Sequence, residues 1–68
     1  MITEKQLKNL GYSVKTIIER TGTIDYRHPE KNYLVNYDHG TVTVIIRGGV
    51  NKLKTEDYER FLEFHNDN

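Results

Sequence analysis

Residues 33–47 read YLVNY-DHG-TVTVIIR, and this stretch decides the fold. Two runs rich in aromatic and β-branched residues flank a short break that contains glycine, a pattern typical of a β-hairpin. Because side chains alternate between the two faces of a strand, one face of this hairpin is predicted to be apolar and buried, and the other polar. The apolar face collects Tyr33, Val35, Tyr37, Val42, Val44 and Ile46, and the polar face carries Asn36, Asp38, Thr41, Thr43 and Arg47.

Residues 12–21 fit two kinds of element. Val14, Ile17, Ile18 and Thr21 have the spacing of a helix face. The segment is nevertheless rich in β-branched residues, which suit a strand better than a helix. We therefore predict a strand that places Tyr12, Val14, Thr16 and Ile18 on one face, followed by a turn at Gly22 and a further strand over residues 23–26.

If residues 7–18 are interpreted as helix, turn and helix, they resemble the opening of helix-turn-helix DNA-binding proteins. The resemblance covers the first helix and the turn at Gly11. The recognition helix that should follow is missing, because residues 23–29 are β-like and end in proline. No family is assigned on this basis.

A helix is predicted near each end of the chain. Thr3 and Gln6 have the spacing of a capping box, and Gly11 suits a helix end, so the first helix should cover about residues 4–10. Thr55 is the expected cap of the second helix. The apolar stripe of that helix should pack on the hairpin and consists of Tyr58, Phe61, Leu62 and His65.

Together these elements predict a single α+β domain over residues 1–68. The expected architecture is a small antiparallel sheet of three to four strands, with the hairpin 33–47 in the centre. A short N-terminal helix and an amphipathic C-terminal helix should pack on it. A chain this short buries only about 60 % of its unfolded surface, which leaves little room for a pocket of about 300–1,000 Å³.

Residues that could carry catalysis or bind a metal are few. The chain has no cysteine and a single serine, Ser13, and a catalytic triad needs a base beside its nucleophile. His28 and His39 flank the strand that begins near Tyr33. About six extended residues at roughly 3.3 Å each place them too far apart to share one ion. We therefore expect no enzyme activity, no catalytic residue, no bound metal and no other cofactor.

Charge is distributed unevenly along the chain. Residues 1–54 carry nine basic and five acidic side chains, which gives +4, whereas residues 55–68 carry one basic and five acidic side chains, which gives −4. Acidic residues at spacings of three and four predict a stripe on the last helix. This stripe is the candidate protein-partner surface and consists of Glu56, Glu59, Glu63 and Asp67.

Basic residues interleaved with tyrosines give a second candidate surface, because single-stranded nucleic acid is commonly held by aromatic side chains along a basic groove. Several of these tyrosines share the apolar face of the hairpin, so we expect them in the core instead. The candidate nucleic-acid surface consists of Lys15, Arg20, Arg27, Lys31 and Arg47.

The sequence favours a small non-enzymatic protein-binding module that contacts another protein or a second copy of itself. Its size and composition suggest an accessory or inhibitor protein of a phage or mobile element. The alternatives are a nucleic-acid-binding module and a small homo-oligomeric structural component. No apolar stretch reaches the roughly 20 residues that cross a bilayer, and the start of the chain lacks a signal-peptide pattern. We therefore expect a cytoplasmic location, no membrane contact and no small-molecule substrate.

Overall fold

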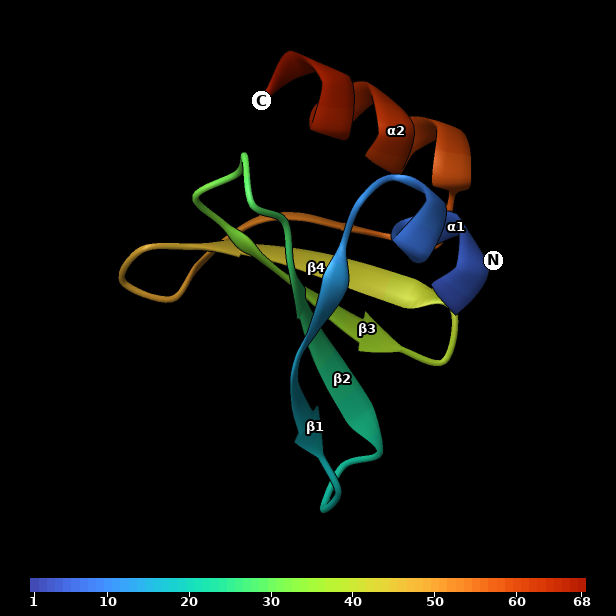
Figure 1. Ribbon diagram of the computed structural model, residues 1–68, viewed down its shortest axis with the longest axis vertical. Helices are drawn as coiled ribbons and strands as arrows, with labels where there is room; N and C mark the ends of the chain where they lie inside the picture. The colour runs from blue at the N-terminus through green and yellow to red at the C-terminus, as the bar shows by residue number, and fades with distance from the viewer.

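The computed structural model describes residues 1–68 as one five-stranded sheet and two helices (Figure 1). In chain order, the elements are α1 (Glu4–Asn9), β1 (Ser13–Ile18), β2 (Thr23–Arg27), β3 (Leu34–Asp38), β4 (Thr41–Ile46), β5 (Val50–Thr55) and α2 (Tyr58–Asp67). The sheet is antiparallel with the order β1-β2-β3-β4-β5, so every strand pairs with its neighbour along the chain. The predicted α+β class and the helix near each end are confirmed. The sheet has five strands instead of the predicted three to four.

The central hairpin has the predicted register. Val35 pairs with Val44 and Tyr37 with Val42, so the apolar side chains of β3 and β4 share one face. Val35, Val42 and Val44 are fully buried. The connecting residues His39 and Gly40 have φ angles of 47° and 102°, and positive φ at both central positions is the requirement of a type I′ hairpin turn.

Residues 13–18 form strand β1, which confirms the strand prediction and overturns the resemblance to a helix-turn-helix opening. A β-bulge interrupts the pairing of β1 with β2 between Val14 and Thr16. The extra residue shifts the alternation, because Val14 then pairs with Tyr26 and Ile17 with Ile24. The prediction that Val14, Thr16 and Ile18 share one face is therefore wrong, since Val14 and Ile17 share it instead.

The strand that the sequence did not predict is β5. Its sequence, VNKLKT, contains only two apolar residues, and five of the six side chains in β1 and four in β5 are exposed. Both strands lie at the edges of the sheet, where one pairing partner and little burial suffice. Thr55 is the last residue of β5, so it does not cap the following helix as predicted.

Side chains cap the N-terminus of both helices. At α1, Thr3 Oγ1 accepts the Gln6 backbone N–H at 3.1 Å and Gln6 Oε1 accepts the Thr3 N–H at 2.9 Å, which confirms the predicted capping box. The cap of α2 is Asp57, whose Oδ1 accepts the Glu59 N–H at 2.9 Å. Thr55 instead binds the backbone of this cap residue, because its Oγ1 accepts the Asp57 N–H at 3.0 Å.

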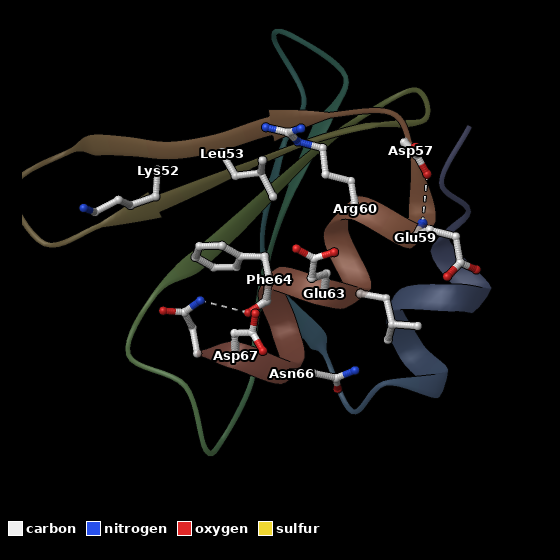
Figure 2. Close-up of a pocket in the computed structure, with 11 residues that line it drawn as sticks. Lys52, Leu53, Asp57, Glu59, Arg60, Glu63, Phe64, Asn66 and Asp67 are labelled. Atoms are coloured by element: carbon white, nitrogen blue, oxygen red, sulfur yellow. Dashed lines mark hydrogen bonds between the residues drawn. The ribbon is translucent and has the colours of Figure 1, made fainter.

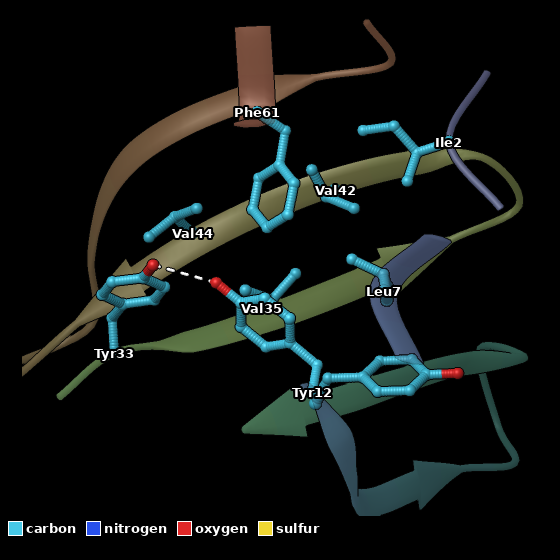
Figure 3. Close-up of a cluster of buried hydrophobic side chains, with 9 residues drawn as sticks. Ile2, Leu7, Tyr12, Tyr33, Val35, Val42, Val44 and Phe61 are labelled. Atoms are coloured by element: carbon cyan, nitrogen blue, oxygen red, sulfur yellow. Dashed lines mark hydrogen bonds between the residues drawn. The ribbon is translucent and has the colours of Figure 1, made fainter. Parts of the chain in front are cut away.

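Both helices cover the same face of the sheet, and the core lies between them and the strands (Figure 3). Phe61 of α2 is fully buried with Val35 and Val44, as predicted. Ile46 is half-buried at the border of the core, and Leu62 lies outside it, which corrects the prediction for Leu62. The core cluster is Ile2, Leu7, Tyr12, Tyr26, Tyr33, Val35, Val42, Val44 and Phe61.

The opposite face of the sheet carries no helix. Across its middle, the strand register aligns one polar side chain from each strand: Thr16, Asp25, Asn36, Thr43 and Lys54. Asn36 Nδ2 donates to Asp25 Oδ1 at 2.8 Å within this row. This face is therefore suited to water. Neither helix of the structure combines the length and the apolar character that a membrane crossing requires.

Candidate functional site

A hydrogen-bonded chain of two tyrosine hydroxyls and one histidine ring joins three distant parts of the sequence beside α2. The Tyr12 hydroxyl lies 2.9 Å from the Tyr33 hydroxyl and 2.8 Å from His65 Nδ1. Tyr12 and Tyr33 are 3 % and 5 % exposed, so both oxygens sit at the edge of the core. Burying polar groups is tolerated here because each has a partner, and no buried side-chain polar atom in the molecule lacks one.

The phenols of this cluster are held in their protonated form. Burial raises the pKa of Tyr12 far above its ordinary value, and the hydrogen bond to Tyr33 raises it further. Burial also raises the pKa of Tyr33. A nucleophile or general base is activated by a pKa shifted toward neutral pH, and these shifts go the other way. The arrangement therefore fits a structural role for the hydroxyl chain.

Two histidines and a lysine meet beside Tyr12. The rings of His28 and His65 lie 5.4 Å apart between centroids, and Lys31 Nζ donates to the His65 carbonyl oxygen at 2.8 Å. His28 Nε2 lies 2.9 Å from the Leu10 carbonyl oxygen, and its Nδ1 accepts the Glu30 N–H at 3.1 Å. Both ring nitrogens of His28 therefore have hydrogen-bond partners within the protein.

Sequence reasoning missed this contact between His28 and His65. It considered His28 together with His39, but His39 is exposed in the β3–β4 turn, where its Nδ1 lies 2.8 Å from Asp38 Oδ1. No group of three or more His, Cys, Asp or Glu side chains is arranged to hold a metal ion. The available signal was the position of His65 on the apolar stripe of α2, which placed one ring against the core.

The predicted acidic stripe is only partly formed. Glu59, Glu63 and Asp67 follow one another at intervals of four on α2, whereas Glu56 lies before the helix and outside the stripe. The three helical carboxylates line an open groove of about 880 Å³ between α2 and β5 (Figure 2). Glu56 and Arg60, which are four residues apart, form no ion pair, because the only contact of that kind in the molecule joins His39 Nδ1 and Asp38 Oδ1.

Leu62 lines this groove between α2 and β5. The apolar part of its lining comes from Leu53, Leu62 and Phe64, so Leu62 lies beside the carboxylates and outside the core. The charged residues that line the groove are four acidic and two basic, which gives a net charge of −2: Asp57, Glu59, Glu63, Asp67, Lys52 and Arg60.

Three of the five predicted basic residues come together. Arg27, Lys31 and Arg47 line an open pocket of about 450 Å³, and no acidic residue shares that lining. The pocket lies between the loop that follows β2 and the β4–β5 turn. These segments meet because the start of β3 pairs with the end of β4 through Leu34 and Ile45. We call this site the basic pocket.

The other two predicted basic residues lie elsewhere. Lys15 is at the bulge of β1, and Arg20 is in the turn between β1 and β2, at the far end of the hairpin from Arg27. Figure 1 shows this hairpin projecting away from α2. The structure therefore divides the predicted nucleic-acid surface into a compact set of three cations and two outlying ones.

No protein-family model, curated protein or solved structure matches the chain.

Proposed function

We propose that the protein is a non-enzymatic protein-binding module, an accessory or inhibitor protein, that receives its partner on β1. The supporting observation is that β1 leaves apolar side chains uncovered. Val14 is 43 % exposed and Ile17 is 63 % exposed, and both lie on the face that the helices cover elsewhere. Ile17 pairs with the half-buried Ile24, so the apolar surface extends from β1 onto β2. We call Val14, Ile17 and Ile24 the hairpin patch.

Single exposed apolar residues are ordinary, but a contiguous set on one face marks an interaction surface more often. β1 is also an edge strand with an unpaired side, a geometry used when a partner adds a strand. The bulge beside Lys15 interrupts that edge. We therefore propose side-chain contact at the hairpin patch as the main interaction, with backbone pairing limited to the residues after the bulge.

The charges around the patch indicate the chemistry of the partner. Lys15 and Arg20 are basic and Glu19 is acidic, and all three are exposed. An apolar partner side chain with acidic neighbours would complement this surface, and such charges mainly raise the association rate. The β1–β2 hairpin projects away from α2 (Figure 1), so the acidic stripe on α2 would form a separate contact.

Affinity capture from the source cell tests this function with two variants that add the same charge. Ile17→Lys places a lysine in the hairpin patch, whereas Thr16→Lys places it one residue away on the opposite face. We expect one protein to be captured by the wild type and by Thr16→Lys and to be lost with Ile17→Lys. Capture of the same protein by all three would contradict the proposed surface.

The outcome also separates the alternatives. Recovery of nucleic acid as the specific ligand would favour the nucleic-acid-binding module. A sedimentation experiment on the purified protein addresses the homo-oligomeric component, because a dimer that Ile17→Lys dissociates and Thr16→Lys preserves would identify a second copy as the partner.

The acidic stripe permits an independent measurement once a partner is known. Reversing the charges of Glu59 and Glu63 should slow association at low salt and leave folding nearly unchanged if the stripe guides the encounter. An unchanged association rate would assign these residues to the solvated surface.

A further inference from the structure

The basic pocket contains positive charge that the protein does not compensate. Arg27 and Arg47 are exposed, and neither forms an ion pair, because His39–Asp38 is the only one in the structure. Asp25 lies two residues from Arg27 on the same face of β2, but its Oδ1 accepts a hydrogen bond from Asn36 at 2.8 Å. Two guanidinium groups are therefore available to an external anion.

The third cation of the pocket is held in place by the fold. Lys31 is half-buried, and its Nζ donates to the carbonyl oxygen of His65 at 2.8 Å. An ammonium group has three N–H donors, so this contact fixes the position of Nζ and leaves further donors for a ligand. A prepositioned cation loses less side-chain entropy on binding than a mobile surface lysine does.

Part of the pocket lining is the backbone of the β4–β5 turn. Gly48 and Gly49 follow Arg47 with φ angles of 86° and 79°, and the Gly49 N–H donates to the Ile46 carbonyl at 3.0 Å to close the turn. A Cβ atom added to either glycine would meet no heavy atom within 4 Å. The backbone of this turn is therefore uncovered, and a ligand can approach it closely.

Part of the lining is apolar. Leu34 and Ile45 pair directly across β3 and β4, lie on the face without helices and are both half-buried. They lie between the strand of Arg27 and the turn of Arg47. The pocket thus combines a cluster of cations with an aliphatic surface. Its volume of about 450 Å³ falls within the range of small-molecule sites, which corrects the expectation that a chain this short leaves little room for such a pocket.

We propose that the basic pocket binds a nucleotide. Its phosphate contacts Arg27, Lys31 and Arg47, and its base or sugar rests on Leu34 and Ile45. A guanidinium group matches a phosphate with two parallel hydrogen bonds, and a phosphate offers more charge and more acceptor oxygens to three cations than one carboxylate does. A free mononucleotide and one residue of a single-stranded nucleic acid supply this same chemistry.

Titration of the ¹⁵N-labelled protein tests the site with four probes: adenosine monophosphate, adenosine, inorganic phosphate and a short oligothymidine. We expect the monophosphate to shift the amide signals of Leu34, Gly48 and Gly49 and to bind more tightly than either adenosine or phosphate. If the oligothymidine binds more tightly than the monophosphate, the source is a single strand. If only the monophosphate shifts these signals, it is a free nucleotide.

Two double variants remove the same charge from different places. Arg27→Gln with Arg47→Gln should weaken binding by roughly tenfold or more, because the charged hydrogen bonds to the phosphate are lost. Lys15→Gln with Arg20→Gln removes two cations outside the pocket and should change the affinity little. All four residues are exposed, and the amide spectrum of each variant verifies its fold.

Three results would overturn the proposal. The first is that no probe shifts the pocket amides. The second is equal weakening by both double variants, which would indicate diffuse electrostatic attraction instead of a site. The third is equal affinity for phosphate and for the monophosphate, because the aliphatic surface would then contribute nothing.

Discussion

The β1–β2 and β3–β4 hairpins are both rich in β-branched residues, but they differ in how far those residues are buried. β3 and β4 bury Val35, Val42 and Val44 completely, whereas the β1–β2 hairpin leaves Val14 and Ile17 43 % and 63 % exposed. All five are β-branched residues on the same face of one sheet. The difference arises because α1 and α2 cover the central strands and do not extend over the end of the β1–β2 hairpin (Figure 1). Apolar alternation therefore predicts a strand, but only the packing of distant helices decides which strand is buried.

Among the substitutions that test this contrast, Phe61→Ala should have the largest effect on stability. Phe61 is fully buried between α2 and the central strands, so its removal should lower the free energy of unfolding by roughly 3–5 kcal/mol, a large part of the stability of a small domain. Urea denaturation followed by circular dichroism measures the change.

The matched substitution in the exposed hairpin is Ile17→Ala, which should change the free energy of unfolding by less than about 0.5 kcal/mol. Thr43→Ala, on the face without helices, should also cost little. Similar losses for Phe61→Ala and Ile17→Ala would show that β1 is covered in solution.

The contrast extends to glycines with positive φ. Gly11 has a φ of 100°, and an added Cβ would lie 2.7 Å from His28 Nε2. Gly11→Ala should therefore cost about 2–3 kcal/mol, from backbone strain together with displacement of His28. Gly48→Ala meets only the backbone strain, because its surroundings are open, and should cost about 1 kcal/mol. Thermal unfolding that ranks the two in the reverse order would contradict this assignment.

Removing one hydroxyl from the core edge should have a smaller effect. Tyr33→Phe deletes the partner of the Tyr12 hydroxyl, at a cost of about 1 kcal/mol in the free energy of unfolding. Tyr58→Phe is the control, because the half-buried Tyr58 forms no side-chain hydrogen bond within the protein. Equal stability of both variants would mean that the hydroxyl chain contributes no net stabilisation.

The smallest effect expected is a pH dependence from His65. Burial lowers the pKa of His65 below its ordinary value of 6.5, and Lys31 and His28 lower it further. The unfolded chain therefore takes up a proton before the folded protein does. The contribution of neutral His65 to the free energy of unfolding is fully present above pH 6.5. It is lost as the pH falls through and below that value.

Urea denaturation at several pH values measures this slope, and two variants assign it. His65→Gln should flatten the slope between pH 7 and pH 5, whereas His39→Gln, which alters an exposed ring, should preserve it. A slope that survives His65→Gln and disappears with His39→Gln would place the titrating group in the β3–β4 turn.

Local sequence patterns predicted the parts of the fold that depend on neighbours along the chain. The capping box of Thr3 and Gln6, the register of β3 with β4 and the burial of Phe61 follow from spacing alone. The sequence did not predict β5, because an edge strand with two lysines has no distinctive apolar pattern. Thr55 was misassigned because it precedes the true cap, Asp57, and can accept an N–H in the same way.

The candidate sites were predictable to a smaller degree. The basic residues could be identified by type, but only the pairing of β3 with β4 shows that Arg27 and Arg47 meet while Lys15 and Arg20 do not. The hairpin patch depends on a bulge that shifts the side-chain alternation by one residue, and nothing in residues 13–18 marks its position. The His28–His65 contact spans most of the chain, beyond the range of periodicity arguments.

The order of strands has a consequence for how the protein folds. Because each strand pairs with the next along the chain, every step of sheet formation closes only a short loop. The core is different, since it brings Ile2 and Leu7 together with Phe61 from the other end of the sequence. We expect the hairpins to form early and reversibly, and the docking of the two helices to make folding cooperative. The turn at His39 and Gly40 would then set the folding rate, whereas the contacts of α2 would set how slowly the native state opens.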